Sequence, residues 1–224
     1  MELYDRIPER ELMDDDEQAR AYAHADFAEA HEAVVDALDT HLGEPSGGAV
    51  ADLGCGPGDV SLRYLARHPG VTCVGIDGSE PMLEHARAAA LGAGLDDRLS
   101  FEARVLPDPT LAGRGFAAVI SNSLLHHLAD PSVLWHTIAD CAVPGAAFAI
   151  CDLMRPGSTD VAAELVDRYA PGEPDVLRAD FYNSLLAAFR PGEIETQLAE
   201  VGFENCEVEP FSDRHLVAWG RTPV

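Results

Sequence analysis

Short apolar runs and amphipathic stretches alternate along the chain after residue 48. The apolar runs are nearly continuous and lie at 48–53, 71–77, 99–105, 116–122 and 145–153. Helical patterns separate most of them and lie at 59–68, 80–94 and 131–142. Strands that are apolar on both faces are typical of a parallel sheet with helices on both sides. The chain is therefore predicted to be an α/β protein with a doubly wound, Rossmann-like sheet.

The last third of the chain departs from this rhythm. Residues 158–190 read as helical and are too long for a simple connection, which predicts a helical lid insertion beside the sheet. Two strands follow at 204–210 and 215–221, and the short loop between them requires an antiparallel hairpin. The sheet should therefore have seven strands and an antiparallel last strand. Residues 1–42 are predicted to form a helical cap, and 1–224 a single domain.

The charge balance excludes some partners. The chain has 224 residues with 15 basic and 39 acidic ones, a net charge of −24, and every basic residue is arginine. Such a surface repels nucleic acid and anionic membranes, because both are bound through Lys and Arg. No apolar run is long enough for a membrane span, and the N-terminus lacks the apolar core of a secretory signal. We expect a cytoplasmic protein, monomeric or homodimeric, that binds neither nucleic acid nor membrane.

Metal binding is not expected from the sequence. The five cysteines include no C-x-x-C pair, and no H-x-x-x-H or mixed Cys/His spacing occurs. His126 and His127 are adjacent, and two adjacent side chains would point apart on a strand.

The segment VADLGCGPGDV, residues 50–60, is the clearest sign of a ligand site. A glycine loop between a strand and a helix can hold a polar ligand at the helix N-terminus. A dinucleotide site has the spacing G-x-G-x-x-G, whereas the last glycine here, Gly58, comes one position early. Asp52, just before the loop, would repel a pyrophosphate but suits a cation. Asp77 ends the next strand, where a carboxylate can accept both hydroxyls of a ribose.

These segments resemble a known family. VADLGCGPGDV, GIDGSEPML and FAAVISNSLLHHLADP are similar to the glycine loop, ribose-acid strand and fourth-strand motif of class I S-adenosylmethionine-dependent methyltransferases, small-molecule branch. The resemblance covers about 50–152. It implies S-adenosylmethionine as cofactor, with S-adenosylhomocysteine as product. It places Asp52 near the amino group of the methyl donor and Asp77 on its ribose.

The resemblance also implies further cofactor contacts. They come from Gly54, Gly56, Gly58, Gly78, Met82 and Asn122, and from Tyr22 of the N-terminal cap, whose ring would face the sulfonium. One departure is visible, because many relatives carry an aspartate near the end of the third strand. This chain has Ala103, Arg104 and Val105 there, and Asp108 lies further along.

The same resemblance implies candidates for a general base. His126 and His127 come after the fourth strand, where the family binds its acceptor, and Tyr182 lies in the helical insertion. The alternative for each is a packing or hydrogen-bonding role. Arg214 and His215, in the terminal hairpin, are expected to make turn and solvent contacts.

Three functions remain open on the sequence. The first is methyl transfer to a small molecule by in-line displacement, with an O, N, S or C acceptor undecided. The second is a catalytically silent protein that binds S-adenosylmethionine as a sensor or partner subunit. The third is a nicotinamide-dependent oxidoreductase, against which the early third glycine and Asp52 both count.

Overall fold

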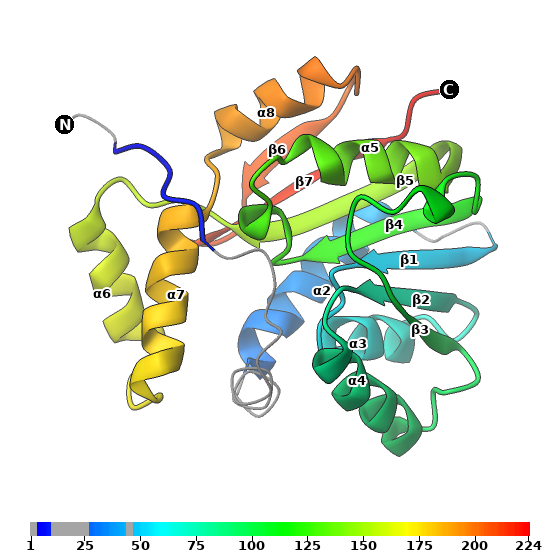
Figure 1. Ribbon diagram of the computed structural model, residues 1–224, viewed down its shortest axis with the longest axis horizontal. Coiled ribbons are helices and arrows are strands. Elements are labelled where there is room, and N and C mark those ends of the chain that lie inside the picture. Colours follow the sequence, from blue (N-terminus) through cyan, green and yellow to red (C-terminus); the bar gives the residue numbers. More distant parts are fainter. Residues whose placement is uncertain (1–3, 10–26, 44–46) are drawn as a thin grey trace.

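The structure is a computed structural model that describes residues 4–9, 27–43 and 47–224. Seven strands form one sheet in the order β3-β2-β1-β4-β5-β7-β6 (Figure 1). β1 to β5 run parallel, and β7 runs antiparallel to both β5 and β6. The strands are β1 (Ala49–Leu53), β2 (Thr72–Asp77), β3 (Leu99–Ala103), β4 (Phe116–Asn122), β5 (Ala142–Leu153), β6 (Glu207–Pro210) and β7 (His215–Arg221). The predicted seven-stranded sheet with a terminal hairpin is confirmed.

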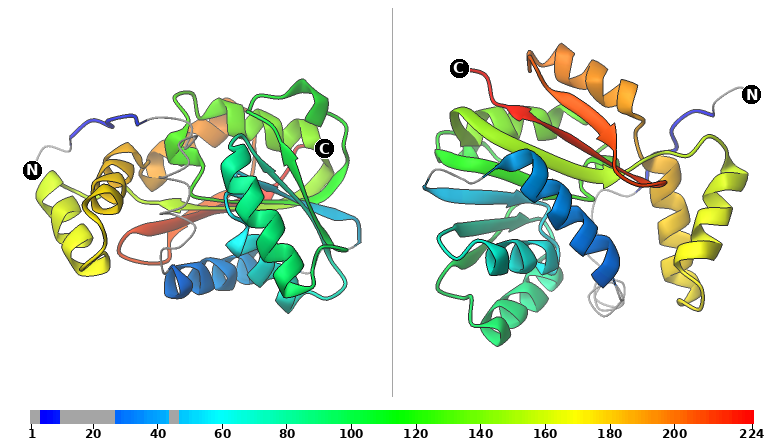
Figure 2. Two further views of the ribbon diagram at one scale, coloured as in Figure 1. Left: turned by 60° about the horizontal axis from the view of Figure 1, so that its bottom comes forward. Right: turned by 180° about the vertical axis from the view of Figure 1, so that it is seen from behind.

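Helices cover both faces of the sheet, as the two views of Figure 2 show. α2, α3 and α4 pack on one face, and α5 and α8 pack on the other. α6 and α7 form a pair beside the carboxyl end of β5, where they pack around Leu153. The helices are α2 (Ala28–Leu42), α3 (Asp59–Arg67), α4 (Glu80–Ala93), α5 (Ser132–Cys141), α6 (Thr159–Tyr169), α7 (Asp175–Ala187) and α8 (Pro191–Glu200), with short 3-10 helices η1 (Pro109–Leu111) and η2 (Leu125–His127).

Local sequence signals set the helix ends. The Ser79 hydroxyl accepts a hydrogen bond from the Met82 N–H, and Pro81 sits in the first turn of α4, where its missing N–H costs nothing. Gly94 ends α4 in the left-handed conformation. α6 begins in the same way, with Ser158 as its cap.

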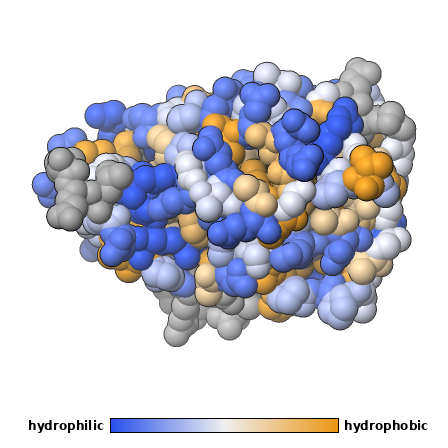
Figure 3. All heavy atoms as spheres, turned by 90° about the horizontal axis from the view of Figure 1, so that it is seen from above, coloured by the Kyte–Doolittle hydropathy of each residue, from blue (hydrophilic) through white to orange (hydrophobic). Residues whose placement is uncertain are grey.

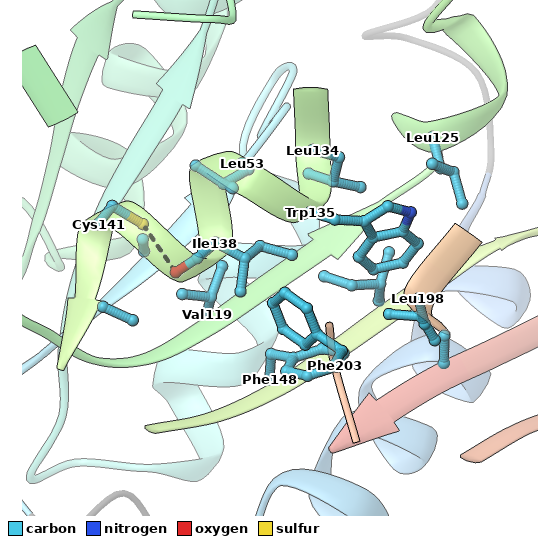
Figure 4. Close-up of a cluster of buried hydrophobic side chains, with 14 of the residues drawn as sticks. Leu53, Val119, Leu125, Leu134, Trp135, Ile138, Cys141, Phe148, Leu198 and Phe203 are labelled. Atoms are coloured by element: carbon cyan, nitrogen blue, oxygen red, sulfur yellow. Dashed lines mark hydrogen bonds between the residues drawn. The ribbon is translucent and has the colours of Figure 1, made fainter. Parts of the chain in front are cut away.

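The larger apolar core lies between the sheet and the α5–α8 face (Figure 4). Trp135 of α5 is fully buried beside Phe148 of β5, and Phe203 meets Phe148 edge to face. The Trp135 indole N–H donates to the Gln197 side chain, 3.1 Å away, which ties α5 to α8. Removing a buried ring of this kind costs about 3–5 kcal/mol, so this cluster holds one whole layer in place.

One expectation about the helical segments needs correction. The cap predicted for 1–42 is helical only from Ala28 within the described residues, because residues 4–9 form no helix and instead contact α7 through the Ile7 N–H. The helical insertion predicted at 158–190 is present as two helices, and Pro171, Gly172 and Pro174 lie in the break between them. Tyr22 lies outside the described residues.

The surface is mainly hydrophilic on the face that faces the viewer in Figure 3. Figure 3 shows one face on which hydrophilic side chains cover most of the area and apolar ones form small separate patches. Among the described residues, no helix combines the length and apolar character needed to cross a membrane.

Candidate functional site

The glycine loop turns sharply between β1 and α3. Gly54 has φ of 71°, and a Cβ there would lie 2.8 Å from the Leu124 side chain. Its N–H donates to the Ile76 carbonyl at 2.7 Å, which holds the loop against β2. Gly56 also has a positive φ, of 52°, but a Cβ there would meet nothing within 4 Å. The loop therefore has one glycine required by close packing and one that faces open space.

Gly58 has a third role. It precedes α3 with φ of 83°, and a Cβ there would lie 3.3 Å from both the Ala86 methyl group and the Phe101 ring. Gly58 does not line the cavity beside the loop. It serves the close packing of α3 on α4 and β3, rather than the ligand contact that the sequence predicted.

Asp77 ties the loop to the end of β2. One of its carboxylate oxygens accepts the Gly56 N–H at 2.8 Å, and the other accepts the Ser79 N–H at 2.8 Å. Burial raises the pKa of Asp77, and the hydrogen bonds from these backbone N–H groups oppose part of the rise. The carboxylate is thus fixed in orientation at the cavity wall.

Asp52 is buried behind the same loop, with 2% of its surface exposed. The Ser61 hydroxyl of α3 donates to it at 2.5 Å. Burial raises the pKa of Asp52 to about 7, and the nearby Asp77 carboxylate adds to the rise. Ser61 is the one hydrogen-bond partner of this carboxylate within the described part of the chain, and a buried carboxylate with so few partners is a favourable site for a cationic group.

These side chains surround one cavity, which we name the glycine-loop cavity. Seven of the predicted cofactor residues line it: Asp52, Gly54, Gly56, Asp77, Gly78, Met82 and Asn122. At its third-strand side the lining is Arg104, Val105 and Leu106. Asp108 lies further along, as predicted, and its carboxylate instead binds Arg104 and Thr110.

The histidine pair lies on η2, directly after β4. Ser123 has φ of 56°, uncommon for a residue with a side chain, and it turns the chain out of the strand. The expectation that adjacent side chains point apart is wrong here, because the two residues occupy a 3-10 turn. Their ring centroids are 4.2 Å apart.

Asp152, at the end of β5, orients His126. The Nδ1 atom of His126 lies 2.5 Å from the Asp152 carboxylate, which also accepts the His126 backbone N–H at 3.3 Å. Burial opposes protonation of the ring, but Asp152 and Glu9 together outweigh it and raise the pKa of His126. The pair is a buried, hydrogen-bonded acid and base.

Glu9 reaches the histidines from the extended segment 4–9. Its Oε1 atom lies 3.4 Å from His126 Nε2 and 3.3 Å from His127 Nδ1, and it accepts the Ser184 hydroxyl at 3.0 Å. Burial raises the pKa of Glu9. Arg6 anchors the segment, because its guanidinium donates to the carbonyls of His126 and Leu128 at 2.7 and 2.9 Å.

A second cavity opens beyond η2, and we name it the histidine cavity. His126 and His127 line it, and its apolar wall includes Phe27, Val34, Leu153, Leu177 and Phe181. The two cavities share His31, Asn122, Ser123 and His127. They therefore adjoin at the carboxyl end of β4.

Other predicted residues are placed differently. Tyr182 lines neither cavity and packs with Tyr4 against the apolar cluster of α6 and α7. Arg214 and His215 were expected to make turn and solvent contacts. Their backbone N–H groups do donate to the Ser212 hydroxyl in the turn, but both residues also line the histidine cavity. Burial lowers the pKa of His215 to about 4 and keeps the ring neutral.

Sequence reasoning missed three residues of the site. Asp152 ends a parallel strand, as Asp52 and Asp77 do, and that position could have revealed it. His31 pairs with Asp59, the first residue of α3, at 2.6 Å and lines both cavities. No local pattern distinguishes His31 or Glu9.

Comparison with known proteins identifies the family. Residues 51–148 match the family model described as a methyltransferase domain. The chain is 32% identical to the 27-O-demethylrifamycin SV methyltransferase of Amycolatopsis mediterranei (strain S699) over 204 residues, which is 87% of this chain and 68% of that protein. The chain belongs to the class I S-adenosylmethionine-dependent methyltransferases. S-adenosylmethionine is the cofactor of this family. The buried Asp52 carboxylate, the half-buried Asp77 carboxylate and the open space at Gly56 in the glycine-loop cavity fit such a cofactor.

Two further comparisons agree on the methyltransferase fold. Methyltransferase GfsG of Streptomyces halstedii is 32% identical to this chain over 140 residues. The matched region is 62% of this chain and 50% of that relative. The crystal structure of the plantazolicin methyltransferase BpumL, with a triazolic desmethylPZN analog and S-adenosylhomocysteine, superposes with a TM-score of 0.69 at 14% identity, covering 93% of this chain and 92% of that one.

Proposed function

We propose that this methyltransferase methylates a hydroxyl oxygen of a small, largely apolar molecule. The observation that carries the proposal is the junction of the two cavities at Asn122, Ser123 and His127, with the His126–Asp152 pair on the far side. A methyl donor in one cavity and an acceptor in the other would meet at this junction.

The glycine-loop cavity is the proposed donor site. S-adenosylmethionine, when bound, supplies a methyl group already activated at a sulfonium carbon. Asp77 is suited to the ribose hydroxyls, because its carboxylate is held in place by the N–H groups of Gly56 and Ser79. Asp52 is suited to the donor's ammonium group, and Gly56 leaves the space that a side chain would fill.

His126 is the proposed general base. Its Nδ1–H donates to Asp152, so the Nε2 atom keeps the lone pair that accepts a proton. The acceptor hydroxyl would transfer its proton to Nε2 as the oxygen attacks, and Asp152 would stabilise the imidazolium that forms. Asn122 and His127 border both cavities and would orient the two reacting groups.

The lining of the histidine cavity supports an acceptor with an apolar body and no negative charge. Phe27, Val34 and Phe181 supply an apolar wall, and the acidic residues of the lining are Glu29, Glu173 and Asp180. Arg214 is not available as an anion site, since its guanidinium stacks on Tyr169 and pairs with Asp213. An oxygen acceptor is favoured because a hydroxyl needs the base that His126 offers, and because the rifamycin relative is named for an O-methyl position.

A screen of matched acceptors tests the proposal. Compounds that share one apolar frame and differ only in a hydroxyl, amine or thiol group are incubated with S-adenosylmethionine, and S-adenosylhomocysteine release is measured. Turnover is expected with the hydroxyl series, phenols above all, because an imidazole can assist their ionisation. Turnover confined to amines or thiols would overturn the oxygen assignment.

A further inference from the structure

Three side chains with metal-ligand atoms converge beside the histidine cavity, and two of them, His126 and His127, line it. The ligand atoms of Glu9, His126 and His127 all lie within 4.8 Å of one another. Glu9 is 15% exposed, His126 2% and His127 14%, so the cluster is largely shielded from water.

The spacing is that of metal ligands. Glu9 Oε1 lies 3.4 Å from His126 Nε2 and 3.3 Å from His127 Nδ1. Both separations lie at the long end of the range for N–H···O hydrogen bonds, which are usually about 2.7–3.2 Å long. Two ligand atoms on a tetrahedral Zn²⁺ ion, each bonded at about 2.0–2.1 Å, are about 3.3–3.4 Å apart.

Asp152 and Ser184 hold two of the three candidate ligands in orientations that suit a bound cation. Asp152 holds His126 Nδ1, which leaves the Nε2 lone pair directed at the Glu9 carboxylate. Metal-binding histidines usually donate their other ring N–H to a carboxylate in this way. The Ser184 hydroxyl fixes the Glu9 carboxylate from α7. With a neutral ring and an ionised carboxylate, two lone-pair atoms face each other, which a positive ion between them would stabilise.

We propose that Glu9, His126 and His127 bind one divalent transition-metal ion of the Zn²⁺ class. Two imidazoles and one carboxylate are a ligand set of tetrahedral zinc, and the fourth position would open into the histidine cavity. The ion takes the Nε2 lone pair of His126. If His126 is the general base, as the proposed function holds, the ion-bound enzyme is inactive toward a hydroxyl acceptor. This consequence rests on the proposed function.

Direct metal titration tests the site. Tag-free protein, stripped with a chelator, is titrated with Co²⁺ by visible absorption and with Zn²⁺ by calorimetry. One ion per chain is expected, with the intense absorption of tetrahedral Co²⁺. Glu9→Gln and His127→Asn should weaken binding at least tenfold, whereas His136→Asn, at an exposed histidine of α5, should not. No binding, or equal binding by the Glu9 and His127 variants, would overturn the site.

Two further readouts separate this proposal from the proposed function. Asp152→Asn should weaken Zn²⁺ binding about 10–100-fold, the usual effect of losing the partner behind a metal ligand. S-adenosylhomocysteine affinity should stay unchanged in the Glu9 variant, because Glu9 does not line the glycine-loop cavity, and this result shows that the variant is folded with its donor site intact. Zn²⁺ should inhibit turnover in competition with the acceptor, and inhibition that competes with S-adenosylmethionine instead would overturn the assignment.

Discussion

The Nδ1 atom of His126 lies 2.5 Å from the Oδ1 atom of Asp152, and each side chain is 2% exposed. The contact joins the turn after β4 to the end of β5, two neighbouring parallel strands. A buried carboxylate fixes both the position and the tautomer of the ring, so the free nitrogen is Nε2, which lies 3.4 Å from Glu9 Oε1 beside the histidine cavity.

Asp152→Asn should therefore reduce turnover by about 10²–10⁴-fold, because the amide no longer stabilises the protonated ring. The effect should fall on kcat, with the KM for S-adenosylmethionine nearly unchanged, since Asp152 does not line the glycine-loop cavity. Asp140→Asn, at an exposed carboxylate of α5, is the matched control. Full turnover by the Asp152 variant would remove the pair from the mechanism.

Asp77→Asn should weaken binding of S-adenosylhomocysteine. Losing a charge-assisted hydrogen bond costs about 1.5–3 kcal/mol, which is about 10–150-fold in the dissociation constant. Titration calorimetry measures the affinity, and thermal unfolding without ligand checks that the loop contacts of Gly56 and Ser79 survive. An unchanged affinity would contradict the ribose role of Asp77.

Gly58→Ala should chiefly lower the stability of the fold, whereas Gly56→Ala should chiefly lower the affinity for S-adenosylhomocysteine. At Gly58 the added methyl group meets Ala86 and Phe101 at 3.3 Å with φ at 83°, so the variant should lose about 1–3 kcal/mol of stability. At Gly56 the φ of 52° also strains an alanine, but the methyl group enters the open glycine-loop cavity, so S-adenosylhomocysteine binding should suffer more than folding. Thermal unfolding and calorimetry on both variants check the pattern. Lost binding without lost stability at Gly58 would contradict it.

Asp52 should make the stability of the ligand-free protein depend on pH. Its pKa is about 7 in the folded chain and near 3.8 when unfolded. Between these values the folded state holds a proton that the unfolded state has released. The contribution of Asp52 to the free energy of unfolding should therefore fall as pH rises from about 4 to 7, then level off. Asp52→Asn should remove that part of the slope, as chemical denaturation at several pH values would measure.

Ionisation of Asp52 should affect donor binding in the opposite direction, so that affinity increases with pH. The proposed contact with an ammonium group needs the ionised carboxylate, so S-adenosylhomocysteine affinity should increase with pH up to about 7. Binding below pH 7 should also release a proton, which calorimetry in two buffers of different ionisation enthalpy detects. If Asp52→Asn showed the same pH profile as the wild type, Asp52 would not contact the ammonium group.

The sheet and its loops were predictable because their signals are local. Runs such as 71–77 and 116–122 are almost continuously apolar, and Ser79 and Gly94 mark helix ends by their own chemistry. The positions of Asp52 and Asp77 in the glycine-loop cavity follow from the rule that ligands bind at the carboxyl ends of parallel strands.

The histidine cavity was less predictable because its residues meet through tertiary structure. Glu9 reaches His126 only because Arg6 and Ile7 bind the segment 4–9 to η2 and α7. The orientation of His127 depends on a 3-10 turn that begins after Ser123, and no periodic pattern predicts so short an element. Tyr182 lies on the face of α7 that packs, together with Tyr4, against the apolar cluster of α6 and α7. Its spacing along the helix did not determine which face that would be.

The most direct test of the account is a single-turnover reaction with trideuteromethyl-labelled S-adenosylmethionine and the best hydroxyl acceptor, comparing wild type with His126→Asn. At saturating donor, wild type should place the label on oxygen, and the variant should do so about 10²–10⁴-fold more slowly while binding S-adenosylhomocysteine normally. Label on nitrogen, sulfur or carbon, or an equal rate in the variant, would contradict hydroxyl methylation assisted by His126.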